Sequence, residues 1–305
     1  MSANAAVAET VIPSTLGTSG PRVGSSRQLT DRLVTGVVWT SFLVAMVPLV
    51  WILGALVVKG GAMLTKASWW TNSQRGMTTQ TAGGGAYHAI LGTLLEAGVT
   101  AVISVPIAIF TAIYLIEYGR GPFARIVSFM VDILTGIPSI VAGLFIYALW
   151  VTTFGFQRVP FAVSLALMLL MIPVVTRSTE EMLKLVPRDL REASYALGVP
   201  KWRTIAKIVL PTAASGILTG VLLGLARVMG ETAPLLVLGP YSQSIATNLF
   251  SGFMGTLPTM INEERNNVTS IPLDRVWGAA LTLILLVLVL NIAGRVVARF
   301  NAVGR

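Results

Sequence analysis

The sequence has 305 residues, of which 54% are hydrophobic and only 11% are charged, and its mean hydropathy is +0.77. Soluble domains carry about 25% charged residues, so this composition excludes an ordinary soluble domain and indicates a protein with several membrane spans. The net charge of +9 requires no nucleic-acid partner, and with no cysteine and one histidine, His88, we predict no disulfide, no thiolate chemistry and no metal site.

Residues 1–30 are rich in small and polar residues without apolar periodicity, and we predict a disordered cytoplasmic tail there. The remaining residues, 31–305, are expected to form one transmembrane permease domain. Their apolar runs predict an all-α polytopic membrane protein with six transmembrane helices, at about 34–58, 89–116, 126–151, 161–176, 212–237 and 276–293. The third run contains Gly136 and Pro138, where a bend or break is expected. Glu96 lies near the outer end of the second, where a solvated carboxylate is expected.

The basic residues predict the orientation of these spans. Six spans place both termini on the same side of the membrane. Fifteen of the 22 Lys and Arg residues fall on that side, six fall on the other, and Arg227 lies within a span. Because basic residues accumulate in cytoplasmic loops, both termini of this multi-pass protein are predicted to be cytoplasmic.

Residues 177–211, called the charged loop below, interrupt the apolar runs. They hold seven basic residues, namely Arg177, Lys184, Arg188, Arg191, Lys201, Arg203 and Lys207. Pro187 at a helix start and Gly198 at a helix end predict a short helix over about 187–197. A second helix is expected to begin at Pro200 and to be stopped by Pro211.

The short helix carries a narrow apolar face that consists of Leu190, Ala193 and Leu197. Such a face suits a groove in another protein, although an amphipathic loop that rests on the bilayer surface is the alternative.

A spaced motif in the same loop favours the groove. Its residues are Glu192, Ala193, Ser194, Gly198, Ile208, Leu210 and Pro211. It resembles the EAA signature of bacterial ABC-importer permeases, with Ser194 in place of the second alanine. The resemblance implies that the loop is the coupling helix that docks into the ATP-hydrolysing subunit.

The fifth apolar run contains two ionisable residues, Arg227 and Glu231. Charges within a span are costly and usually have a function, and a spacing of four residues places both on one helical face. A structural ion pair is one interpretation. The other is an anion site, because the planar guanidinium fork matches a tetrahedral oxyanion. A neighbouring carboxylate could accept a hydrogen bond from a protonated oxyanion and repel one without a proton, which would favour phosphate over sulfate.

Several strings extend the resemblance over most of residues 87–238. They are YHAILGTLL at 87–95, AIYLIEYG at 112–119, TGIPSIVAGL at 135–144, IPVVTRSTEEML at 172–183 and ARVMGETAPLL at 226–236. Together they resemble the A-type membrane subunit of the high-affinity phosphate ABC importer. The resemblance implies the type I importer permease fold in a bacterial inner or plasma membrane, surrounded by lipid. It also implies that Arg227, Glu231 and Arg177 lie along the substrate path.

The resemblance further implies partners and a division of labour. The expected partners are a homologous C-type permease subunit, two copies of an ATPase subunit inside and an extracytoplasmic phosphate-binding protein outside. ATP and Mg²⁺ would bind to the ATPase subunits, with no cofactor on this chain, which lacks a GxxxxGK[ST] loop and is not expected to be an enzyme. The alternatives are a permease for sulfate, molybdate or a phosphonate, or a membrane scaffold or phosphate sensor that transports nothing.

Overall fold

The computed structural model describes residues 25–78, 81, 83–265 and 270–303. Within these ranges the secondary structure is entirely helical, which confirms the predicted all-α class. The predicted tail, residues 1–30, lies outside the described residues as far as residue 24, whereas residues 25–30 belong to the first helix.

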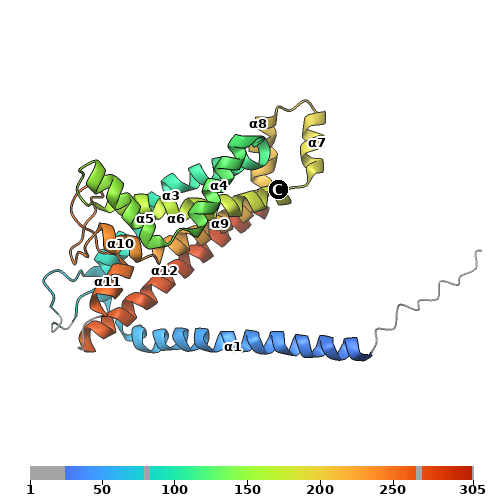
Figure 1. Cartoon of the computed structure of the whole chain (residues 1–305). Coiled ribbons are helices and arrows are strands. Elements are labelled where there is room, and N and C mark those ends of the chain that lie inside the picture. Colours follow the sequence, from blue (N-terminus) through green and yellow to red (C-terminus); the bar gives the residue numbers. More distant parts are fainter. Residues whose placement is uncertain (1–24, 79–80, 82, 266–269, 304–305) are drawn as a thin grey trace, which may run out of the picture. The chain divides into compact units, whose positions relative to one another are not determined.

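The helices follow one another as shown in Figure 1. The first part of the chain contains α1 (Ser25–Leu64), α2 (Ala67–Thr71), α3 (Tyr87–Ile113) with the π-helical turn η1 (Tyr114–Tyr118), α4 (Pro122–Gly136), and α5 (Ser139–Ile146) with the π-helical turn η2 (Tyr147–Thr153). The second part contains α6 (Pro160–Leu185), α7 (Arg188–Ala196), α8 (Lys201–Thr204) with the π-helical turn η3 (Ile205–Val209), α9 (Leu210–Met229), α10 (Ala233–Leu238), α11 (Leu257–Glu264) and α12 (Ser270–Val303).

Five of these helical segments are long and apolar enough to cross a membrane, and a bent pair raises the number to six. The pair consists of α4 and α5 with η2, which meet at an angle of 109°. Between them Ile137 has an extended backbone with ψ of 128°, the conformation that a following proline favours. The predicted break at Gly136–Ser139 is therefore confirmed.

Two helices extend beyond their predicted ends. Helix α6 continues to Leu185, so the first nine residues of the charged loop are helical. Pro211 does not stop the second helix of the charged loop, because α9 runs through it. A proline ring crowds the carbonyl group four residues earlier, but η3 has already widened the backbone there, with the Leu210 N–H bonded to the Ile205 carbonyl group five residues back.

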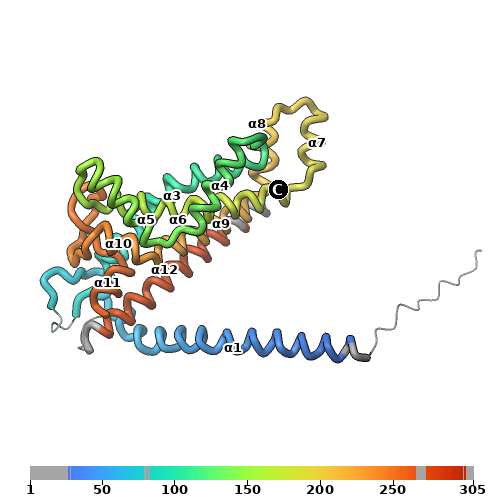
Figure 2. Tube along the Cα trace, viewed as in Figure 1, coloured from blue at the N-terminus to red at the C-terminus, as the bar shows by residue number. Residues whose placement is uncertain are grey.

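The chain divides into two compact units. The first contains the part of α1 up to Leu53, a single helix whose large apolar side chains are mostly exposed, as expected for a lipid-facing span. The second unit runs from Gly54 to Arg305. Within it, α7 and α8 lie at one end of the helical bundle, and α10 and α11 lie at the other (Figures 1 and 2).

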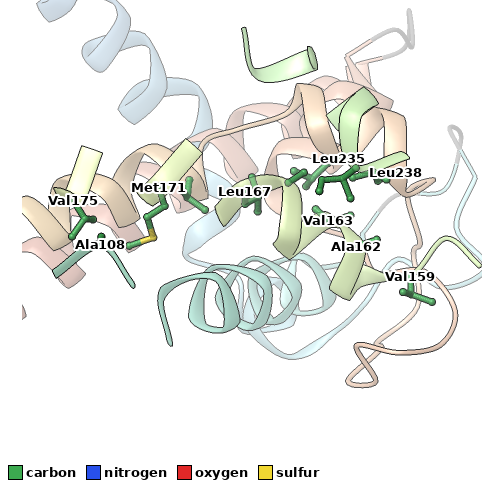
Figure 3. Packing of buried hydrophobic residues seen from close by; sticks show 12 residues of the cluster. Ala108, Val159, Ala162, Val163, Leu167, Met171, Val175, Leu235 and Leu238 are labelled. Atoms are coloured by element: carbon green, nitrogen blue, oxygen red, sulfur yellow. The ribbon is translucent and has the colours of Figure 1, made fainter. Parts of the chain in front are cut away.

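Helix α6 is the centre of the second unit and packs against α3, α9, α5 and α4. Figure 3 shows its buried apolar side chains along the helix axis, with Ala108 of α3 beside one end and Leu235 and Leu238 of α10 beside the other. Small residues let α9 approach closely. A Cβ atom at Gly216 or Gly220 would collide with side chains of α6, and one at Gly224 would meet Val175 at 3.1 Å.

A buried polar network joins the segments around α11. The Glu264 carboxylate accepts hydrogen bonds from Arg275 Nη1 at 3.1 Å and from Gln74 Nε2 at 2.6 Å. The Tyr241 hydroxyl donates to Gln74 and lies 2.8 Å from His88 Nε2. Burial raises the pKa of Glu264, and the guanidinium of Arg275 opposes that rise. The network therefore connects α11 and α12 to the segment before α3 and to the loop after α10.

Candidate functional site

Arg227 and Glu231 form an ion pair, with Arg227 Nε 3.5 Å from Glu231 Oε1. The Arg227 side chain is 48% exposed and that of Glu231 is 16% exposed. Among the described residues Arg227 has no hydrogen-bond partner for its two Nη groups. About half of the Arg227 side chain is therefore exposed, and only its Nε lies close to the carboxylate of Glu231. We call this arrangement a half-open guanidinium.

The prediction that both residues lie on one continuous helix is wrong. Helix α9 ends at Met229, and Glu231 follows Gly230 in the three-residue connection to α10. Gly230 has a weak helical propensity, and Pro234 near the start of α10 lacks the N–H that a continuous helix would need. The pair still meets because Gly230 keeps near-helical dihedral angles.

The end of α9 also changes the expected depth of Arg227. The sequence places it past the midplane of a span, roughly 22 Å into a core of about 30 Å, whereas the structure places it in the last turn of the span Lys201–Met229. A cation there is favoured by the helix dipole, whose negative end lies at the C-terminus.

Glu96 lies near the pair, and its predicted solvated state is wrong. The residue is 3% exposed, because α3 packs against α6 along its length. With Glu231, Thr93 and Thr256 it lines a cavity of about 10 Å³, which is close to the space that one water molecule needs. This cavity is therefore too small for a phosphate ion.

Arg177 lies on α6, away from Arg227, and its guanidinium makes more polar contacts. Its Nη1 donates to both oxygens of Glu180, at 3.0 and 2.8 Å, and its Nη2 lies 2.5 Å from Asp132 Oδ1 and 3.0 Å from the carbonyl oxygen and hydroxyl of Ser128. These contacts join α6 to α4. Two carboxylates already neutralise this guanidinium, which distinguishes it from Arg227.

The structure does not bring Arg177 and Arg227 together. Gly220 of α9 lies against Ser178 of α6, which fixes the register of the two helices. Arg227 is seven residues further along α9, or roughly 10 Å at 1.5 Å per residue. The two arginines therefore belong to separate clusters of charge.

The predicted helix of the charged loop is present as α7, with Pro187 just before its first residue. Gly198 follows it with φ of +75°, and the N–H groups of Gly198 and Val199 bond to the carbonyl groups of Tyr195 and Ser194. This is the Schellman pattern, in which glycine relieves the strain of a left-handed residue. The predicted C-terminal glycine is confirmed.

Ser194, which replaces the second alanine of the signature, has a partner for its hydroxyl group. It is 3% exposed, and its hydroxyl lies 2.8 Å from that of Thr204, which joins α7 to α8. The other motif residues divide by environment. Glu192 and Ala193 are exposed, Ile208 and Pro211 are partly buried, and Leu210 packs against an apolar cluster that includes Ile205 and Val209.

Arg191 anchors α7 to the membrane-spanning helices. It pairs with Glu117 of η1 at 3.1 Å, and it donates to the carbonyl groups of Val186 at 2.6 Å and Leu183 at 2.9 Å at the end of α6. Both side chains of the ion pair are largely buried, at 15% and 6% exposed. A displacement of α7 would therefore be transmitted to η1 and α6.

The opposite face of α7 is open. Leu190 is 41% exposed and Leu197 is 83% exposed, and Ala193 between them is also exposed. The structure therefore leaves the apolar face predicted from the sequence uncovered.

Sequence reasoning missed two of the acids that organise these clusters, Glu180 and Glu117, and also the anchoring role of Arg191, whereas it left Asp132 open between a structural pair and a contact with phosphate. Their partners lie up to 74 residues away along the chain, so spacing alone could not pair them. The i,i+3 spacing of Arg177 and Glu180 was a usable signal, because residues so spaced are neighbours on a helix.

Comparison with known proteins supports this arrangement of charged loop and spans. Residues 104–302 match the family described as binding-protein-dependent transport system inner membrane component. The chain is 55% identical over 268 residues to the phosphate transport system permease protein PstA of Mycobacterium leprae, which covers 88% of each sequence. The chain belongs to this family of membrane transport components.

A second relative and one solved structure extend the comparison. The phosphate transport system permease protein PstA 1 of Mycobacterium tuberculosis is 52% identical, over 92% of this chain and 91% of its own. A chain of a bacterial alginate ABC transporter, solved with an alginate-bound periplasmic protein, superposes with a TM-score of 0.62 at 14% identity and covers 87% of this chain and 93% of its own. The fold is therefore that of an ABC importer permease, and the protein is a multi-pass inner membrane protein.

Proposed function

We propose that this chain is the subunit through which an ATP-driven importer moves inorganic phosphate across the bacterial inner membrane, with both termini cytoplasmic. The observation that carries the proposal is the half-open guanidinium of Arg227, next to the carboxylate of Glu231. The names of the two mycobacterial relatives, both phosphate transport permeases, support phosphate as the substrate.

The pair has the chemistry that phosphate recognition requires. The free Nη groups of Arg227 can donate two parallel hydrogen bonds to a tetrahedral oxyanion. The carboxylate of Glu231 can accept a hydrogen bond from a protonated oxygen of phosphate. Sulfate has no such proton at neutral pH, so it would meet an uncompensated repulsion.

The chain would provide half of the path. The side chain of Arg227 is exposed on this chain, and the cavity beside Glu231 is too small for phosphate. We propose that a homologous C-type permease subunit covers Arg227 and completes the path. An extracytoplasmic binding protein would deliver phosphate from outside, as the family description and the alginate transporter suggest.

The chain would take its energy from partner subunits. The open face of Leu190, Ala193 and Leu197 fits a groove in an ATPase subunit, and we propose two such subunits, with ATP and Mg²⁺ bound there and no cofactor on this chain. The contacts of Arg191 would pass the movement of the ATPase from α7 to the spans, which would rock between outward-open and inward-open states.

The proposal is tested by uptake of ³²P-phosphate at low external concentration, in cells whose own gene is replaced by the wild type or by a variant. Arg227→Ala is expected to abolish uptake, because among the described residues Arg227 supplies the only guanidinium that pairs with Glu231. Glu192→Arg is expected to abolish it as well, because it reverses the charge of an exposed residue of α7, the helix that we propose docks into the ATPase subunit. Arg203→Ala, on the exposed part of the charged loop, is the matched control, with membrane abundance measured by immunoblot.

The outcomes separate the alternatives. Normal uptake by Arg227→Ala at normal abundance would show that the pair is a structural brace and that the chain is a scaffold or sensor. Uptake of sulfate in place of phosphate by the wild type would assign the path to another oxyanion. A gain of sulfate competition in Glu231→Gln is the result expected if the carboxylate selects for a protonated substrate.

A further inference from the structure

A basic cavity of about 390 Å³ lies between α7 and the ends of α3 and α6. Its charged lining consists of Arg120, Lys184, Arg188, Arg191 and Lys201, against a single acid, Glu117. The lining therefore carries five positive charges and one negative charge. It is far larger than the cavities of about 10 Å³ beside Glu96, and its size falls in the range of small-molecule sites.

The one acid of the cavity is already neutralised. Glu117 pairs with Arg191 at 3.1 Å, and its backbone carbonyl group accepts a hydrogen bond from Lys201. Lys201 also lies 4.7 Å from the centre of the Tyr118 ring. Two cations of the lining thus hold η1 to α7 and to α8, and no acid of the lining remains for the others.

The other three cations have no acidic partner among the described residues. Arg120 follows η1, Lys184 lies in the last turn of α6, and Arg188 is the first residue of α7. All three are exposed, and Arg188 stands at a helix N-terminus, where the dipole disfavours a cation. Three like charges around one hollow repel each other, and a bound anion would remove that cost.

An ordinary solvated loop would not gather its charges in this way. Arg125, Arg203 and Lys207 are also exposed and belong to the segments predicted to be cytoplasmic, and none of them lines this cavity. They are the basic residues that a cytoplasmic surface normally carries.

We propose that this cavity is a second anion site, distinct from the path at Arg227, that binds a phosphate group. Arginine forks and a lysine ammonium are the groups that recognise tetrahedral phosphate oxygens. The phosphate group can belong to free inorganic phosphate or to the headgroup of an anionic lipid. In either case the ligand links α6, α7 and the turn after η1, and thus ties the docking helix to two spans.

The test uses the full chain purified into lipid nanodiscs, in an Arg227→Ala background that removes the path site. The cavity variant combines Arg120→Gln, Lys184→Gln and Arg188→Gln. The matched control combines Arg125→Gln, Arg203→Gln and Lys207→Gln, which removes the same charge from the same side. Equilibrium dialysis with ³²P-phosphate in phosphatidylcholine discs measures the free anion, and native mass spectrometry of phosphatidylglycerol discs counts retained lipid.

Saturable phosphate binding that the control keeps and the cavity variant loses at least tenfold would assign the site to free phosphate. Retained phosphatidylglycerol that only the cavity variant loses would assign it to a lipid headgroup. Equal behaviour of the two triple variants in both measurements would overturn the proposal. If the cavity variant does not fold, Lys184→Gln and Arg188→Gln are measured singly. Because the readout is binding without the path arginine, failure of phosphate transport would leave the result unaffected.

Discussion

Two Arg–Glu pairs in this molecule use the same side chains in opposite ways. Arg275 and Glu264 are 3% and 7% exposed, their atoms approach to 3.1 Å, and Gln74 donates a second hydrogen bond to the same carboxylate oxygen. Arg227 and Glu231 are 48% and 16% exposed and approach to 3.5 Å. The closed pair holds α11 against α12, whereas the open pair leaves the side chain of Arg227 about half exposed. Residue type therefore does not distinguish the two pairs, whereas the exposure of their side chains does.

Removal of the closed pair should have the largest effect on stability. Arg275→Ala leaves the buried Glu264 carboxylate without its cation, and we expect a loss of about 3–5 kcal/mol in the free energy of unfolding. Chemical unfolding of the purified protein in detergent measures it. Arg265→Ala is the control, because Arg265 is exposed and should change stability by less than about 0.5 kcal/mol. Equal effects of the two substitutions would contradict the structural role of the closed pair.

Removal of the Arg177 side chain should have an intermediate effect on stability. Arg177→Ala deprives Glu180, which is 4% exposed, and Asp132 of their shared cation, and we expect a loss of about 2–3 kcal/mol. The same unfolding measurement applies, with uptake recorded at a temperature where the variant is folded. Full stability combined with lost uptake would instead place Arg177 on the substrate path, as the family resemblance implies.

Removal of the hydrogen bond between the uncharged hydroxyls of Ser194 and Thr204 should have a smaller effect on stability. Ser194→Ala restores the alanine of the signature but removes a buried hydrogen bond, and we expect a loss of about 1 kcal/mol. A double-mutant cycle with Thr204→Val isolates the coupling between the two residues. Additive effects in that cycle would mean that the two hydroxyls do not hold α7 to α8.

The open pair should have the smallest effect on stability. Arg227→Ala removes a half-exposed ion pair, and such pairs contribute about 0–1 kcal/mol. The unfolding curve should therefore nearly superpose on that of the wild type, although uptake is lost. A loss of several kcal/mol would mean that Arg227 is a brace like Arg275.

Much of the fold could be predicted from the sequence because local signals control it. Apolar runs indicate the spans, Pro138 imposes the break between α4 and α5, and Gly198 marks the end of α7. Pro211 misled the prediction because the wide turn before it depends on hydrogen bonding that no residue pattern displays. The end of α9 at Met229 was missed although Gly230 and Pro234 both disfavour a continuous helix.

The site was less predictable because its properties depend on contacts between distant segments. The residues Arg227 and Glu231 could be chosen from their cost inside a span. The exposure of their side chains could not be predicted, because it depends on how the rest of the chain packs around them. Glu96 was expected in solvent because its position near a span end says nothing about α6, which covers it. Which acids neutralise Arg177 and Arg191 depends on how the helices pack against each other, and the sequence does not show this packing.

The π-helical turns η1 and η3 have a mechanical consequence. Each lies where a long helix, α3 or α9, meets the region around α7, and each holds hydrogen bonds that span five residues instead of four. Conversion of such a turn to α-helix would transfer one residue, which rotates the helix beyond it by about 100° and shifts it by about 1.5 Å. A force on α7 could thus rotate α3 and α9 about their own axes, and the backbone hydrogen bonds of both helices would be kept.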